Sequence, residues 1–141
     1  MPVITIESND GLLAKMIPQS EWKEGSHFFS EAHDYLQVGT WRYSAGKTLG
    51  PHIHNEVQRT IHHTSEVIFV YNGSIMASVY DGQKQLVKQV VLKEGDTLIL
   101  LKGGHGYEIL EDDTRVLEIK NGPYPGPELD RRLINEESNG L

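Results

Sequence analysis

Apolar and polar residues alternate in short runs along the chain, and few stretches show the longer spacing of an amphipathic helix. The runs are rich in Val, Ile, Leu and aromatic residues, which is typical of β-strands. We expect strands at residues 35–43, 67–71, 74–80, 85–92, 97–101, 106–110 and 115–120. Pairs such as Asn72-Gly73 and Asp81-Gly82 lie between them and favour tight turns. The pattern therefore predicts an all-β fold.

Strands this short and regularly spaced bury their apolar faces best in a sandwich or a closed barrel, because an open meander leaves its edges unpaired. We predict one domain over residues 1–141, with a double-stranded β-helix (jelly-roll) barrel at about 35–120. Residues 1–34 are expected to form an N-terminal arm, with a short helix or lid at 20–34. The Pro-rich residues 121–141 are expected to form a strap along the outside.

Composition narrows the functional classes. The chain has 141 residues, a formal net charge of -7 and no cysteine. Its basic residues are scattered, which argues against nucleic acid or an anionic membrane as the main partner. The missing cysteines exclude disulfides, a thiolate nucleophile and a finger-type zinc site. No stretch has eighteen consecutive apolar residues and the start has no basic, then apolar, leader pattern. We therefore expect a cytoplasmic location.

Four histidines, His52, His54, His62 and His63, fall within twelve residues. Residues at i and i+2 of a strand point to the same face about 7 Å apart, so His52 and His54 could reach one metal ion. His62 and His63 would point to opposite faces, so only one of them could line a cavity.

The surrounding residues resemble the cupin superfamily. Gly46 precedes the His-x-His pair with the spacing Gly-x5-His-x-His, and Glu66 is followed by six residues and Gly73. The stretch GDTLILLKGGHG, residues 95–106, is similar to the second cupin motif. The resemblance covers about residues 38–120 and implies a small jelly-roll barrel, in agreement with the strand pattern.

The resemblance implies that the metal ligands are His52, His54, Glu66 and His105. Three imidazoles and one carboxylate suit a divalent first-row metal, namely Fe, Mn, Ni, Cu or Zn, and leave positions open for substrate. Eleven residues separate His54 from Glu66, where the family has three or four. Two other registers remain open, one pairing His62 with Glu66 and one placing Gln58 at the position of the glutamate.

The leading hypothesis for function is a small-molecule enzyme with a mononuclear metal at the barrel centre, acting on a polar, sugar-like substrate. The C-terminal run KNGPYPGPELDRR resembles small bacterial cupins of surface-polysaccharide and sugar-nucleotide metabolism. The alternatives are a metal-free sugar-nucleotide isomerase or epimerase with His52 or His54 as base, and a noncatalytic protein that binds or senses a small ligand. The aromatic residues, Tyr107 among them, are expected mainly in the core.

We also expect a homodimer. Residues 4–6 and 12–17 are apolar and have no obvious partner in the predicted barrel. A second copy of the chain could cover them through one two-fold interface.

Overall fold

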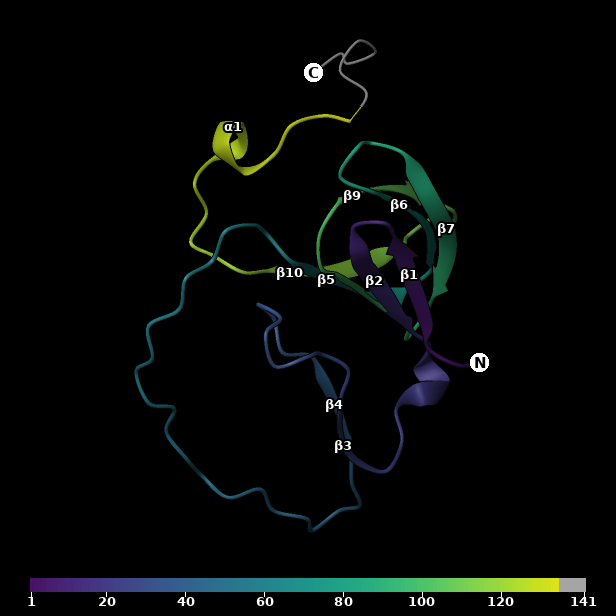
Figure 1. The fold of residues 1–141 in the computed structure, drawn as a ribbon. Helices are drawn as coiled ribbons and strands as arrows, with labels where there is room; N and C mark the ends of the chain where they lie inside the picture. Colours follow the sequence, from purple (N-terminus) through teal and green to yellow (C-terminus); the bar gives the residue numbers. More distant parts are fainter. Residues whose placement is uncertain (135–141) are drawn as a thin grey trace.

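The computed structural model describes residues 1–134 and is built almost entirely of antiparallel strands (Figure 1). The larger sheet has the order β1 (Ile4–Ser8), β2 (Gly11–Ile17), β8 (Thr97–Leu100), β5 (Glu66–Asn72) and β10 (Arg115–Lys120). The smaller sheet has the order β7 (Leu86–Lys93), β6 (Ser74–Tyr80) and β9 (Gly104–Ile109). A separate pair consists of β3 (Gly25–Phe28) and β4 (Gly39–Arg42). Two short helices, the 3-10 helix η1 (Gln19–Glu21) and α1 (Pro127–Asp130), complete the elements.

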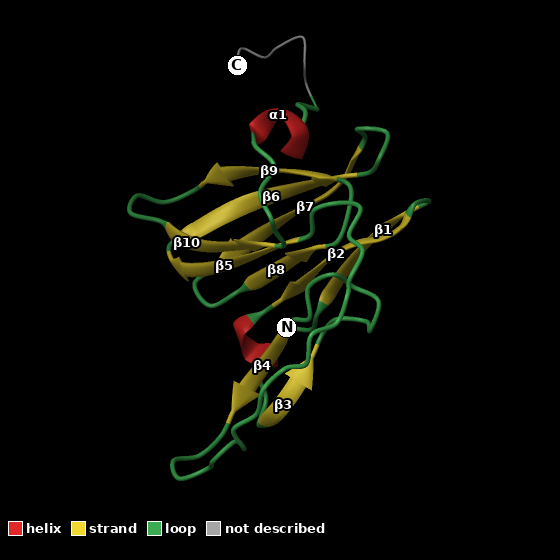
Figure 2. Ribbon diagram, turned by 90° about the vertical axis from the view of Figure 1, so that its left-hand side faces the viewer, coloured by secondary structure: helices red, strands yellow, loops and turns green. Residues whose placement is uncertain are grey.

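The two larger sheets enclose one apolar core, as in a β-sandwich. Leu13, Val70 and Leu98 of the larger sheet and Val79 and Leu92 of the smaller sheet are completely buried in it. Figure 2 shows the two sheets as layers, with the β3–β4 pair projecting from them. The prediction of an all-β fold is therefore confirmed.

The described strands do not close into a barrel. β1 contacts β7, so the two sheets meet along one side of the sandwich. On the other side β9 pairs only with β6, and β10 pairs only with β5. Both strands therefore present a free edge, and the sandwich is open between β9 and β10.

The predicted strands 74–80 and 115–120 have the bounds of β6 and β10, and four others differ from β5, β7, β8 and β9 by a few residues at their ends. The predicted strand 35–43 is reduced to β4. The reason is a turn before it, in which the Gln37 amide donates to the carbonyls of Glu31 and Asp34, and Val38 N–H donates to Ser30 Oγ. These bonds hold the chain in a curve.

The N-terminal residues belong to the larger sheet and are no detached arm. β2 pairs with β8 in the register Met16↔Leu98, and Ile6, Leu13, Met16 and Ile17 are buried at 0–1% exposure. Residues 4–6 and 12–17 therefore have partners within the same chain, and the premise from which a dimer was predicted is wrong. Residues 20–34 hold the end of η1 and β3, in place of the expected single helix or lid.

Residues 44–64, which we call the arm, form an extended segment that leaves β4 and returns to β5. Every residue of the arm is exposed. In Figure 1 the arm is the blue-to-teal trace that curves away from the sandwich. No strand forms in it, which contradicts the expectation that His52 and His54 lie on one.

After β10 the chain runs along the outside, as expected of the strap, through α1 to residue 134. The remaining predicted strap residues, 135–141, lie outside the described part of the chain. Among residues 1–134, no helix has the length and apolarity needed to cross a membrane.

Candidate functional site

A carboxylate and an imidazole meet at the open side of the sandwich. Glu66 is the first residue of β5, held between β8 and β10, and is 4% exposed. His105 lies on β9, in the facing sheet. The His105 Nε2 and Glu66 Oε2 atoms are 3.2 Å apart, so the two sheets bring together residues that are 39 positions apart in the sequence.

Tyr107 adds a hydroxyl to this pair. It lies two residues after His105 on β9, so both side chains point to the same face of the strand. Its ring lies 5.4 Å from the His105 ring, and its hydroxyl donates to Glu66 Oε1 over 3.5 Å, a long hydrogen bond. Burial raises the pKa of Tyr107 far above its ordinary value, and the charges of Glu66 and Glu118 raise it further. The hydroxyl therefore keeps its proton at any physiological pH.

A second carboxylate, Glu118 on β10, interacts with Glu66. Burial raises the pKa of Glu118, and the hydrogen bond with Glu66 and the charge of Glu66 raise it further, while Lys120, 3.5 Å from Glu118 Oε1, opposes this. For Glu66, burial opposes ionisation, but the hydrogen bond and charge of His105 outweigh it and lower the pKa. Of the two carboxyls, Glu66 is thus the one that ionises first and stays paired with His105.

An apolar cavity of about 220 Å³ lies beside these groups, in the opening between the two sheets. Its lining residues come from both sheets: Ile68, Ile75, Tyr107, Ile109, Val116 and Glu118. The cavity therefore has mostly apolar walls, with Tyr107 and Glu118 as its lining residues that carry polar groups. This combination is common in binding sites for small molecules.

The structure divides the four predicted metal ligands into two pairs. Glu66 and His105 form one pair in the sandwich. His52 and His54 form the other in the arm, with ring centroids 4.9 Å apart and His52 Nδ1 lying 3.0 Å from the carbonyl of Gly50. Nowhere in residues 1–134 do three or more His, Asp or Glu side chains converge in a way that could hold a metal ion. The imidazole and carboxylate donors suit a divalent metal, but this conformation does not assemble them.

The two alternative registers also leave their residues outside the sandwich site. Gln58 is exposed in the arm. The His62 N–H donates to the Tyr35 hydroxyl, and the His63 ring packs on the Tyr35 ring at 4.6 Å. Tyr35 and His63 line a second cavity of about 310 Å³, which also contains Asp34 and Lys102.

Sequence reasoning did not single out Tyr107 and Glu118 for this site. Tyr107 could have been found from its i+2 spacing to His105 on a predicted strand. Glu118 could not, because it reaches Glu66 only through the pairing of β10 with β5, in the register Glu118↔Ile68. Neither protein-family models, nor curated proteins, nor solved structures give a match to this chain.

Proposed function

We propose that this protein is a metal-independent acid–base catalyst that moves a proton next to the carbonyl group of a small molecule, as isomerases and epimerases do. The observation that carries the proposal is the His105–Glu66 pair, 3.2 Å apart, together with Tyr107, which contacts both residues and also lines the apolar cavity. A base, a group that orients it and a neutral proton donor are the parts that such a reaction needs.

The roles follow from the contacts. His105 is about one third exposed, so it can meet a ligand, and it accepts the proton from the carbon beside the carbonyl. Glu66 stays ionised next to it and stabilises the imidazolium that results. Tyr107 donates a hydrogen bond to the carbonyl oxygen, on which negative charge develops. In a hydroxyketone, His105 returns this proton to the former carbonyl carbon and the neighbouring hydroxyl passes its proton to the former carbonyl oxygen, which gives the isomer and leaves His105 neutral. If the enolate turns over first and the proton returns to its original carbon, the product is the epimer.

This proposal keeps the chemistry of the metal-free alternative from the sequence but replaces His52 or His54 by His105 as the base. The substrate has an apolar part that fits against Ile68, Ile75 and Val116. Keto sugars linked to a nucleotide are one class to include, since the C-terminal run resembles cupins of sugar-nucleotide metabolism. The cupin resemblance and a jelly-roll topology are part of this proposal.

Deuterium exchange tests the proposal without knowledge of the complete reaction. The protein is incubated in D2O with a panel of small ketones, hydroxyketones and nucleotide-linked keto sugars, and NMR follows loss of the proton next to each carbonyl. We expect catalysed exchange for at least one compound, a loss of 100-fold or more in His105→Gln, and wild-type exchange in Glu108→Gln, which changes the opposite face of β9. Binding of a compound without exchange would instead favour the noncatalytic ligand-binding function, and equal exchange in His105→Gln would refute the proposed base.

A mononuclear metal enzyme is the second candidate, favoured by the side-by-side rings of His52 and His54. If the arm folded over the open side of the sandwich, these rings could join Glu66 and His105 around one ion. Elemental analysis of protein purified without added metal separates the candidates. Stoichiometric metal that is lost in both His54→Ala and His105→Ala supports the metal enzyme, and metal-free protein that catalyses exchange refutes it.

A further inference from the structure

We propose that the open side of the sandwich binds the arm of a second copy of this chain, so that two protomers exchange residues 44–64 and form a homodimer. The inference goes beyond the proposed function and does not depend on it, because the His105–Glu66 pair forms within one chain. It rests on the free edges of the sandwich, on the pattern of the arm and on the direction in which the arm leaves the protomer.

The free edge of β9 is suited to receive another strand. Leu110 N–H, directly after β9, donates to Ser74 O on the neighbouring strand β6. Because backbone groups alternate between the two sides of an antiparallel strand, the N–H and C=O groups of His105, Tyr107 and Ile109 point away from β6, toward the open side. An unpaired edge of this kind binds an extended segment through main-chain hydrogen bonds.

The open side is also apolar. Ile109 is 60% exposed on β9, and Val116 on the facing edge strand β10 is 38% exposed. Both line the 220 Å³ cavity, which continues the core outward through Ile68 and Ile75. A protein that left this side uncovered would expose apolar side chains next to two unpaired strand edges.

The arm has the pattern of a strand that is missing its partner. Leu49, Ile53, Val57 and Ile61 are spaced by four residues, which places them on one face of an extended chain, whereas His52, His54, Glu56 and Gln58 fall on the other face. All four apolar residues are exposed, Ile53 at 92%. Within the described chain, the arm's only backbone-to-backbone hydrogen bond joins Lys47 N–H to Ser44 O. The arm thus carries unpaired amides and an apolar stripe that nothing covers.

Charge favours the same contact. The chain as a whole carries -7, but in the arm the cations Lys47 and Arg59 outnumber the single acid Glu56. The open side presents Glu118 in the cavity and is followed by the acidic turn Glu111-Asp112-Asp113 after β9. A positive arm is therefore attracted to a negative receiving surface.

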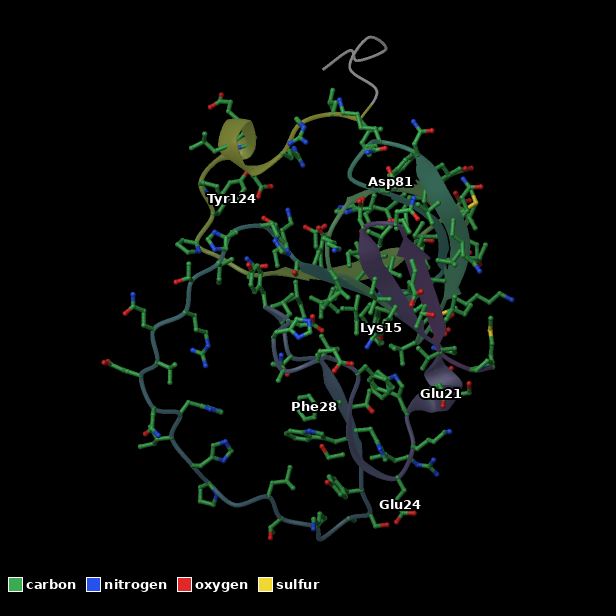
Figure 3. The ribbon with its side chains drawn as sticks, viewed as in Figure 1. Lys15, Glu21, Glu24, Phe28, Asp81 and Tyr124 are labelled. Carbon is green, nitrogen blue, oxygen red and sulfur yellow. The ribbon has the colours of Figure 1, made fainter. Side chains whose placement is uncertain are left out.

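The second copy, and not the same chain, is the occupant that this conformation favours. The arm curves away from its own β9, and Figure 3 shows its side chains standing clear of the sandwich. Its C-terminal end is held by His62 N–H on the Tyr35 hydroxyl, and Ser65 N–H donates to Asn121 Oδ1 over 2.6 Å. A protomer with a detached extended arm and a vacant edge is what a strand-exchanged dimer requires, and a two-fold axis satisfies both arms at once.

Two proline variants test the exchange by complementation. Ile53→Pro removes an amide from the arm, where the side chain contacts little of its own protomer. Ile109→Pro removes an outward amide from the receiving edge and leaves the β6–β9 hydrogen bonds in place. Ile53→Thr and Ile109→Thr are the matched controls, since they keep the amide. Circular dichroism checks that each variant retains its β structure.

Light scattering at micromolar concentration gives the readout. We expect wild type and both threonine variants near twice 15.9 kDa, and each proline variant alone near 15.9 kDa. An equimolar mixture of the two proline variants should regain dimers, because the intact arm of Ile109→Pro fits the intact edge of Ile53→Pro. Monomeric wild type would overturn the proposal. Dimers of either proline variant alone, or no dimers in the mixture, would also overturn it. The exchange assay compares wild type with His105→Gln and Glu108→Gln and uses neither proline variant, so this proposal and the proposed function can fail separately.

Discussion

The charge pair between Glu66 and His105 predicts a measurable, pH-dependent contribution to stability. The perturbation is a double-mutant cycle with Glu66→Gln, His105→Gln and the combined variant, which isolates the interaction of the two side chains. At pH 5.5 Glu66 is ionised, because its pKa lies below its ordinary value of 4.5. The His105 ring, whose Nε2 lies 3.2 Å from Glu66 Oε2, then faces a full negative charge.

The magnitude follows from the separation and the burial. At the observed 3.2 Å, opposite unit charges attract by about 5 kcal/mol at an effective dielectric constant of about 20, and by about 1.3 kcal/mol in bulk water. The His105 side chain is 32% exposed and the Glu66 side chain 5% exposed, so the environment lies between these limits, and burial of the carboxylate subtracts from the gain. We expect a coupling free energy of about 1–2 kcal/mol, toward the lower end of hydrogen bonds to charged groups.

Urea unfolding at pH 5.5 and at a series of lower pH values is the assay. Protonation of Glu66 removes its charge, so the coupling should fall to about 0.5 kcal/mol as the pH drops through the native pKa of Glu66. The sign for Glu66 agrees: its lowered pKa stabilises the folded state above pH 4.5, and this stabilisation is lost as the pH falls through the native pKa. The exposed pair Glu21–Lys23, at 3.0 Å, is the control and should couple more weakly. Equal coupling across the pH series, or none at pH 5.5, would refute the reasoning.

Two further predictions concern the strands around the site. Gly73 has a φ of +86°, and a Cβ there would lie 2.8 Å from Thr114 Cα. Gly73→Ala should therefore lower the free energy of unfolding by at least about 1–2 kcal/mol. Gly106→Ala is the control: a Cβ there would have no atom within 4 Å, so this variant should be as stable as wild type or more stable. Equal urea midpoints for the two variants would contradict this. Glu118 has a raised pKa, so its stabilising effect is present at low pH and is lost as the pH rises through the native value. Glu118→Gln should therefore be more stable than wild type at pH 7 and equally stable at pH 4. A variant that is less stable than wild type at pH 7 would show that burial and the charge of Glu66 do not outweigh the contact with Lys120.

The alternation of apolar and polar residues was sufficient to predict the bounds of strands that pair with the next strand in the sequence. β6 begins after the turn Asn72-Gly73 and alternates buried with less buried residues, so its bounds could be predicted. The role of the N-terminal strands could not be predicted in this way. Met16 finds its partner at Leu98, and neither stretch indicates the other in the sequence. Strand pairing over such separations is decided by the packing of the whole core.

The candidate site shows the same division between local and distant information. The motif resemblance predicted Glu66 and His105 as site residues, and the structure brings these two together. Tyr107 lies two residues after His105 on the same strand, so its side chain could have been placed on the same face. The position of the His52–His54 pair depends on the eleven residues between His54 and Glu66. Their alternating pattern predicts an apolar and a polar face, but it does not predict which strand they pair with. An amphipathic strand in a sequence does not state which edge it will pair with, or in which molecule.

The pairing of β2 with β8 has a consequence for the order of events during protein synthesis. Ala14 pairs with Leu100, which is made 86 residues later. At a synthesis rate of roughly 5–20 residues per second, β2 waits about 4–17 s for its partner strand. During that interval β2 can pair only with β1, and Leu13, Met16 and Ile17, all buried in the finished protein, have no facing sheet to cover them. The nascent chain thus passes through a period in which its own beginning exposes apolar side chains, and slower translation lengthens that exposure.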